Sequence, residues 1–197
     1  MPIDLTNLGL ECSDDWVPLP ATDDMDLDYW ASHEAQNITE RYEREGRPPA
    51  DTARLARSLR RVAADSRTRT PVCAFGWYLS GQYDVIAILE IDAIYPDDTV
   101  PVLTLEWLAE NISAGDFGEP DVRYVELPLG DAVRIRENMA GDRKWRFGSR
   151  PVIRALTYGV RPRDSDGLLT LRVSWTESVV DEPLEQIVDN IAGTLSL

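Results

Sequence analysis

The sequence predicts an α+β protein, organised as an α/β/α sandwich around a mainly antiparallel sheet of about six to seven strands. Three observations predict this fold. Strand-like and helix-like segments come in separate runs, one strand-like segment is apolar on both faces, and an amphipathic helix closes the chain. Because 197 residues contain no linker-like or low-complexity tract, we expect residues 1–197 to form a single globular domain.

The N-terminal part of the chain is predicted to contain one strand and two helices. The stretch DDWVPLP, residues 14–20, has the pattern of a short strand closed by prolines. Residues 23–46 have a helical period, an acidic N-terminus, an apolar stripe from Leu27 to Tyr42 and a terminating Gly46. Residues 50–66 continue the helical period, with their leucines on the side expected to be buried.

The period then changes from helical to strand-like. The segments PVCAFGWYLS and DVIAILEIDAIY flank a Gly-Gln pair, and we expect them to form a hairpin. The second segment begins with consecutive apolar residues at 85–89, so both of its faces are apolar there. A strand of this kind needs a packing layer on each face of its sheet.

The C-terminal part is predicted to contain a short helix, four strands and a last helix. The helix TLEWLAENIS precedes the strands DVRYVELPLG, AVRIRENM, RPVIRALTYGV and DGLLTLRVSW. In the last strand apolar and polar residues alternate strictly, which is typical of a half-buried strand. The segment EPLEQIVDNIAGTLSL, residues 182–197, places apolar side chains from Leu184 to Leu195 at helical spacing, so we expect this helix to dock on the sheet.

Three of these segments carry a resemblance to a known group. ELPLGDAVRIRE, LTYGVRPRDSDGLLTLRVSWTES and LEQIVDNIAGTLSL resemble the C-terminal half of uncharacterised actinobacterial proteins with the PsbP/Mog1-like fold, over roughly residues 125–197. In that group a G-x-A-V-R strand precedes a Y-x-V-P strand, and an LLxLxFST strand and an FDxIAxTL helix close the domain. Here Ser174-Trp175-Thr176 replaces Phe-Ser-Thr and Val188-Asp189 replaces Phe-Asp, which keeps the apolar pattern. The resemblance implies an accessory, chaperone-like or partner-binding role, and it transfers no catalytic signature.

Charge and hydropathy exclude several classes of function. A net charge of −15 argues against binding to nucleic acid or to an anionic membrane. The charge is uneven, because residues 51–74 and 133–163 carry net charges of +4 and +7 between acidic segments. No apolar run is long enough to span a bilayer, and the N-terminus lacks a signal-peptide pattern. We therefore expect a cytoplasmic protein with reduced thiols, with a Cys12–Cys73 bridge as the alternative.

No constellation of residues predicts catalysis, a metal site or a cofactor. His33 is the only histidine, and the calcium-like start DDMDLDYW lacks the glycine and the glutamate that a calcium loop needs. Glu90 and Asp92 share one face of a predicted strand, where we expect a polar strand end; a pair of carboxylates in a pocket is the alternative. We therefore predict no catalytic residue, no metal and no cofactor, and hence no enzyme.

Two groups of side chains are candidates for binding a partner. One is the basic strand and loop near residue 140, and the other is the aromatic hairpin near residue 80. The candidates are Arg134, Arg136, Arg143, Lys144, Trp145, Arg146, Phe147, Tyr78 and Tyr83. Trp145 would be the anchor of a cationic loop that binds an acidic partner. The alternatives are a solvated hairpin whose Trp145 folds back onto the sheet, and a loop that binds phosphate or a single strand.

We therefore expect a non-catalytic accessory or protein-binding module that acts through a charged surface on an unidentified protein partner. One alternative is an immunity- or antitoxin-like inhibitor of a basic partner, since the acidic segments would speed its association. Another alternative is a small-ligand-binding protein or an enzyme, with a pocket that includes Glu90, Asp92 and Tyr83.

Overall fold

The computed structural model describes residues 2–22, 24–48, 51–79, 81, 82, 84–113, 115–141 and 150–197. Its elements follow one another in the predicted order, which confirms an α+β protein with a seven-stranded antiparallel sheet and, in the described part of the chain, four α-helices. The elements are β1 (Trp16–Leu19), α1 (Leu27–Arg44), α2 (Thr52–Arg67), β2 (Cys73–Trp77), β3 (Ala87–Ile94), α3 (Leu105–Ile112), β4 (Asp121–Leu127), β5 (Gly130–Ala140), β6 (Val152–Val160), β7 (Leu168–Trp175), the 3₁₀ turn η1 (Ser178–Val180) and α4 (Asp181–Ala192).

The strands are arranged in the order β1-β2-β3-β7-β6-β5-β4. The chain forms two compact units. The N-terminal unit is Ser13–Glu90, and the C-terminal unit combines Met1–Cys12 with Ile91–Leu197. The expectation of a single domain stays a prediction.

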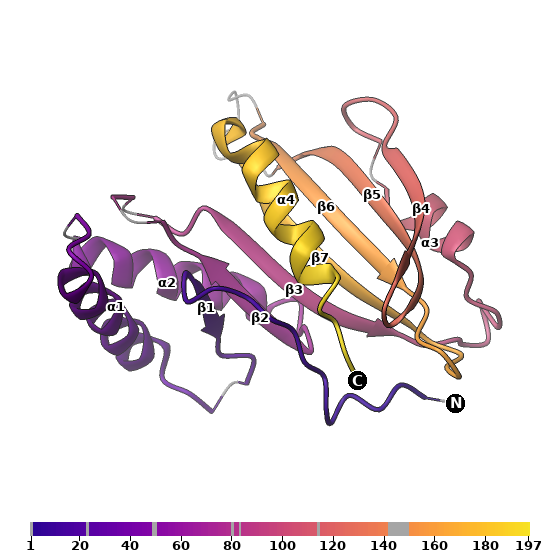
Figure 1. Cartoon of the computed structure of the whole chain (residues 1–197), viewed down its shortest axis with the longest axis horizontal. Coiled ribbons are helices and arrows are strands. Elements are labelled where there is room, and N and C mark those ends of the chain that lie inside the picture. The colour runs from indigo at the N-terminus through magenta and orange to yellow at the C-terminus, as the bar shows by residue number, and fades with distance from the viewer. Residues whose placement is uncertain are drawn as a thin grey trace. The chain divides into compact units, whose positions relative to one another are not determined.

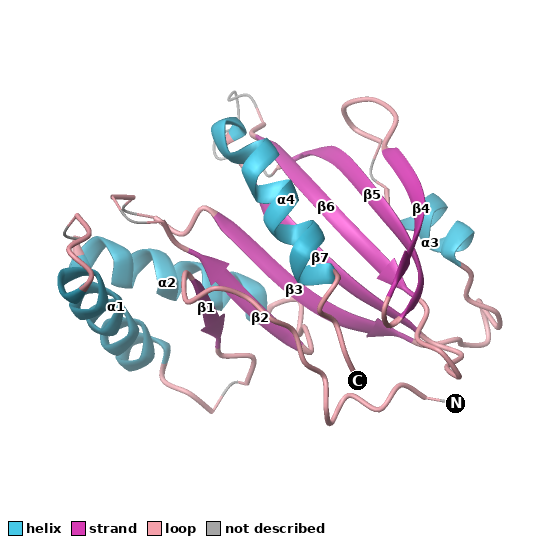
Figure 2. Cartoon of the chain, in the orientation of Figure 1, coloured by secondary structure: helices cyan, strands magenta, loops and turns pink. Residues whose placement is uncertain are grey.

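Two packed helices dominate the N-terminal unit (Figure 2). The carboxylate of Asp26 caps α1 by accepting hydrogen bonds from the backbone N–H groups of Asp28 and Tyr29. The predicted apolar stripe of α1 is buried, including Ala35 and Tyr42, and the leucines of α2 meet it. The helical spacing in the sequence therefore identified the contact face of both helices.

The connection between β2 and β3 is longer than the predicted two-residue turn. β2 ends at Trp77, whose ring stacks on its cross-strand neighbour Trp16 with centroids 5.9 Å apart. The N–H of the next residue, Tyr78, donates to the carbonyl of Asp15 at 2.9 Å on the β1 side, while the carbonyl of Trp77 accepts from the N–H of Ile86 at 3.0 Å on the β3 side. β3 then begins only at Ala87, so strand pairing resumes later than the sequence suggested.

Strands β4 to β7 form continuous antiparallel ladders in the C-terminal unit. A two-residue turn joins β4 to β5, with Leu127 opposite Gly130. Gly130 has a φ of +155°, and a Cβ there would lie 2.0 Å from the carbonyl oxygen of Arg161. Only glycine fits this close approach, so the position of the hairpin depends on it.

Helices cover both faces of this part of the sheet. α3 packs on the face of Val133 and Ile135, and it approaches so closely that a Cβ on Gly159 would lie 1.9 Å from Leu108 Cδ2. α4 packs on the opposite face, where it crosses β6 and β7 in Figure 1. The strands of the C-terminal unit therefore have a helix on each face, whereas β3, the strand predicted to be apolar on both faces, is fully buried on one face only, at Ala87, Leu89 and Ile91.

The last helix ends earlier than predicted. α4 stops at Ala192 with Gly193 as its C-cap, and the hydroxyl of Thr194 donates back to the carbonyl of Ile191 at 2.7 Å. Ser196 then pairs with Gly9 in an isolated bridge. Leu195 is buried as its spacing suggested, but it lies outside the helix.

Candidate functional site

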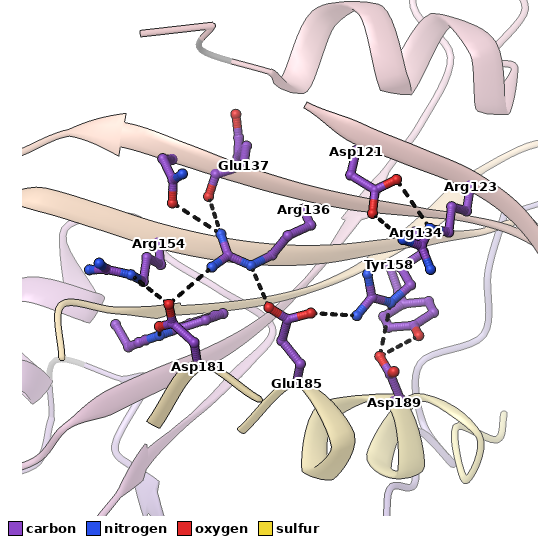
Figure 3. A network of polar contacts seen from close by, with 12 residues as sticks. Asp121, Arg123, Arg134, Arg136, Glu137, Arg154, Tyr158, Asp181, Glu185 and Asp189 are labelled. Carbon is purple, nitrogen blue, oxygen red and sulfur yellow. Dashed lines mark hydrogen bonds and ion pairs between the residues drawn. The ribbon is translucent and has the colours of Figure 1, made fainter. Parts of the chain in front are cut away.

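The guanidinium groups of Arg134 and Arg136 lie in an ion-pair network between β5 and α4 (Figure 3). Nη2 and Nε of Arg134 donate to Glu185 Oε2 at 2.9 Å and to Asp189 Oδ1 at 3.0 Å. Nε of Arg136 donates to Glu185 Oε1 at 2.7 Å. The two arginine side chains are only 10% and 16% exposed, so both positive charges are largely neutralised inside the protein.

The sequence of α4 explains how the helix neutralises the arginines. Asp181, Glu185 and Asp189 are spaced by four residues and therefore lie along one side of the helix. Leu184 and Val188 lie next to them and are completely buried. One helix thus contributes both an apolar contact and a row of carboxylates to the same face of the sheet.

The network continues to the N-terminal end of α4. Asp181 accepts hydrogen bonds from Arg154 Nε at 3.0 Å and from Trp175 Nε1 at 2.6 Å. The guanidinium of Arg136 lies 4.8 Å from the centre of the Trp175 ring, which is a cation–π contact. Trp175 is one of the residues that depart from the motifs of the resembling group, and here its indole N–H connects the last strand to Asp181 of α4.

The pKa values of Tyr158 and Arg134 are both raised within the network. Burial raises the pKa of Tyr158, and its hydrogen bond to Asp189 at 2.7 Å raises this pKa further. Desolvation lowers the pKa of Arg134, but its hydrogen bonds with Asp189 and Glu185 outweigh this effect and leave the pKa above its usual value. Neither Tyr158 nor Arg134 is poised to exchange a proton near pH 7, and both hold α4 against the sheet through Asp189.

Among the candidates that the structure describes, it brings together Arg134 and Arg136. They share one face of β5 as expected, and their binding to a partner stays a prediction. Four hydrogen bonds from Arg134, Arg136 and Arg154 to carboxylates of α4 already engage these side chains within the chain. The remaining basic and aromatic candidates and one tyrosine lie outside the described residues: Arg143, Lys144, Trp145, Arg146, Phe147 and Tyr83.

Tyr78 does not offer the exposed contact that the sequence suggested. Its side chain is 0% exposed, and its ring stacks on Tyr42 with centroids 5.6 Å apart. Its hydroxyl donates to the carbonyl of Gln82 at 2.7 Å, within the loop that follows β2. The expectation of exposure was wrong because the tyrosine hydroxyl finds a backbone acceptor and the ring can be buried with it.

Glu90 has a role within the N-terminal unit. It accepts hydrogen bonds from Ser66 Oγ at 2.6 Å, in the last turn of α2, and from Arg69 Nη2 at 2.8 Å, just after the helix. The bonds to Glu90 raise the pKa of Arg69 above its usual value.

In the part of the chain that the structure describes, no group of three or more His, Cys, Asp and Glu side chains is arranged to bind a metal. Among the same residues, none of the helices has the length and hydropathy of a membrane span.

The structure also shows an acidic surface that the sequence-based candidates did not include. An open groove of about 420 Å³ runs between the start of α3 and the hairpin of β4 and β5. The exposed carboxylates of Glu106, Glu126 and Asp131 line it, together with the ring of Tyr124. We call these four residues the acidic groove. Tyr124 is 56% exposed, so an apolar ring stands among three negative charges.

One signal of the acidic groove is present in the sequence. Residues 103–131 contain seven acidic side chains and one basic side chain, Arg123. Composition alone does not show that acids from α3, β4 and β5 meet, because that depends on the packing of α3 against the sheet. The aromatic candidates of the sequence were Tyr78, Tyr83, Trp145 and Phe147, and they do not include Tyr124, which lies on β4.

A scan of protein-family models and a search of curated proteins give no match to the chain.

Proposed function

We propose that this protein is a non-catalytic accessory module that binds a basic segment of another protein through the acidic groove. One observation carries the proposal. Arg134 and Arg136, the two basic candidates that the structure describes, are paired with α4, whereas the carboxylates of Glu106, Glu126 and Asp131 are exposed around an exposed tyrosine. The charged side chains that line the groove are therefore all acidic.

The residue types of the groove suit a cationic peptide. Carboxylates form charge-assisted hydrogen bonds with arginine and lysine, and the face of a tyrosine ring attracts the same cations. Tyrosine also contributes a large contact area at a low cost in side-chain entropy. A net charge of −15 would in addition speed the approach of a basic partner at low ionic strength.

We also propose that the chain has the PsbP/Mog1-like fold. Support comes from the seven-stranded antiparallel sheet and from helices α3 and α4 on opposite faces of the C-terminal strands. The last strand and last helix of the resembling motifs correspond to β7 and α4. An experimental structure with a different strand order would contradict this assignment.

The acidic groove also favours a second function, an immunity-like inhibitor of a basic enzyme. Such an inhibitor would use the same carboxylates, so the two functions differ only in what the partner does. If the basic partner is an enzyme, inhibition of its activity at stoichiometric concentration distinguishes the inhibitor from an accessory module.

The proposed function can be tested with synthetic peptides. We would titrate the protein into fluorescently labelled Arg-Gly and Glu-Gly alternating octapeptides and follow anisotropy at about 50 and about 300 mM salt. We expect only the basic peptide to bind, with an affinity that falls about tenfold or more at the higher salt concentration. Equal binding of the two peptides, or no binding of the basic one, would contradict the proposal.

A further inference from the structure

β4 ends the sheet and has an uninterrupted open edge. In the described sheet its only strand neighbour is β5, and the register runs from Asp121 opposite Arg136 to Leu127 opposite Gly130 without a bulge. No proline lies within β4, since the prolines at 120 and 128 stand outside it. Bulges and internal prolines are common ways to block an edge strand, and β4 has neither.

The direction of the backbone groups of β4 follows from a single hydrogen bond. The carbonyl of Asp131 accepts from the N–H of Arg161 at 2.8 Å, so the backbone of Asp131 faces β6. The backbone N–H and C=O groups of its neighbour Ala132 must then point toward β4, where Ala132 is opposite Val125. Because backbone groups alternate along a strand, the odd-numbered residues of β4 pair with β5.

The even-numbered residues of β4 therefore present their N–H and C=O groups at the open edge. These are Val122, Tyr124 and Glu126. Their side chains lie on the face of the sheet that α3 covers, since they are opposite Val133 and its alternate neighbours. The same residues that offer backbone hydrogen bonds thus contribute Tyr124 and Glu126 to the acidic groove.

We infer that the partner's basic segment binds as an extended strand that pairs with the open edge of β4. This inference rests on the proposed function and specifies how the segment is held. Backbone hydrogen bonds to Val122, Tyr124 and Glu126 position the added strand. Its alternate side chains then lie over the acidic groove, where Arg or Lys contacts Glu106, Glu126 and the ring of Tyr124.

The charge around β4 favours a basic partner over a second copy of this chain. Pairing of β4 with β4 would bring together two surfaces that each carry seven acids and one base over residues 103–131. Like charges across paired strands are destabilising. A basic segment would be attracted to these acids instead of repelled, and it has the same backbone N–H and C=O groups for pairing as a second β4 strand.

The test uses two basic octapeptides of equal charge that both alternate Arg with Val, one of them N-methylated at the backbone nitrogen of every Arg. Side chains over the groove belong to the residues whose backbone pairs with β4, so only the unmethylated Arg-Val peptide has the N–H groups needed to add a strand. We expect it to bind at least about tenfold more tightly than the N-methylated peptide, as a loss of about 1.4 kcal/mol corresponds to tenfold. Hydrogen exchange should slow at the amides of Val122, Tyr124 and Glu126, and should change little at those of Arg123 and Val125.

Two variants at one position separate the backbone from the side chain. Tyr124→Ala removes the ring but keeps the outward N–H, and Tyr124→Pro removes both without breaking a bond to β5. We expect Tyr124→Ala to weaken binding of the Arg-Val peptide, and Tyr124→Pro to weaken it by about a further tenfold. Unchanged circular dichroism and an unchanged exchange rate at Val125 would show that each variant keeps the β4–β5 pairing.

The outcomes distinguish the two proposals. If both basic peptides bind equally, the three edge amides stay unprotected and Tyr124→Pro behaves like Tyr124→Ala, then strand addition is wrong while binding of a basic partner stands. If neither basic peptide binds better than a Glu-Val octapeptide, both proposals are wrong. A dimer of the protein alone that Tyr124→Pro abolishes, detected by sedimentation, would overturn the basic partner in favour of a second copy.

Discussion

Arg123 and Arg134 are cross-strand neighbours on β4 and β5, and yet their surroundings differ. Arg134 is 10% exposed and bonded to two carboxylates of α4, whereas Arg123 is 64% exposed and bonded to Asp121 on its own strand. A charge that is paired at the surface contributes little to stability, whereas removal of one partner of a buried pair leaves uncompensated charge. Arg134 lies under α4 and Arg123 does not, so we expect the two arginines to contribute differently to the stability of the protein.

We expect Arg134→Ala to destabilise the protein by about 1–3 kcal/mol, because the largely buried guanidinium donates charge-assisted hydrogen bonds to Glu185 and Asp189 that are then lost. Arg123→Ala is the matched control and should cost about 0–1 kcal/mol. Urea unfolding followed by tryptophan fluorescence measures both. If both variants lose the same free energy of unfolding, then burial under α4 does not strengthen the ion pairs of Arg134.

Tyr42 predicts a pH dependence at the alkaline end. Burial and a hydrogen bond to Asp15 raise its pKa to about 12, from the value of 10.0 expected in the unfolded chain. The folded state therefore holds this proton more tightly. Its contribution to stability is complete below about pH 10 and is lost as the pH rises toward about 12.

We expect Tyr42→Phe to be less stable than the wild type by about 1 kcal/mol at pH 9, because the hydrogen bond to Asp15 is lost. The difference should shrink between about pH 10 and about pH 12, where the wild type must ionise Tyr42 on unfolding and the variant has no hydroxyl to ionise. Free energies of unfolding measured in urea across this range test the expectation. A difference that stays constant would show that ionisation of Tyr42 is not linked to folding.

At the scale of elements, Glu185 is the carboxylate of α4 that both buried arginines share. Glu185→Ala should increase hydrogen exchange in α4 by about tenfold or more, since two charge-assisted bonds are lost. Glu182→Ala removes an exposed acid from the same helix and should leave the exchange rates nearly unchanged. Similar exchange in the two variants would mean that apolar packing alone holds the helix.

The packing of α3 depends on a single missing side chain. A Cβ on Gly159 would overlap Leu108 of α3, so Gly159→Ala should cost about 1–3 kcal/mol even though alanine is stiffer in the unfolded chain. Gly193→Ala, at a position with helical φ at the end of α4, should change stability by less than about 1 kcal/mol. Thermal unfolding measures both, and a neutral Gly159→Ala would show that α3 can shift freely.

The periodicity of the sequence predicted the helices and strands, but it did not predict where α4 ends or which helix covers each face of the sheet. The stripe of α1 and the alternation of β7 were identified because each repeats over many residues. The end of α4 was placed too late because Leu195 continues the helical spacing although the chain leaves the helix at Gly193. The neutralisation of Arg134 was not foreseen, because strand alternation shows which face a residue takes but not which helix covers it.

At the scale of the whole molecule, a net charge of −15 has two different consequences. Distributed over the surface, it attracts any basic molecule weakly and in proportion to the total charge. Concentrated in the acidic groove, it favours a cationic segment at one place, because three carboxylates and a tyrosine ring act together there. The two effects can be separated by removing the same number of charges from different places.

The last prediction compares two triple variants with the same net charge. The groove triple removes the carboxylates of the acidic groove by Glu106→Gln, Glu126→Gln and Asp131→Asn. The control triple changes Glu40, Glu43 and Glu182, which are exposed elsewhere, to Gln. We expect the groove triple to weaken binding of the Arg-Val octapeptide by about tenfold to a hundredfold, and the control triple by less than about threefold. The steep salt dependence should also be lost only in the groove triple, because local ion pairs produce it. Equal weakening in both variants would show that the protein attracts basic partners through its total charge and has no specific site for them.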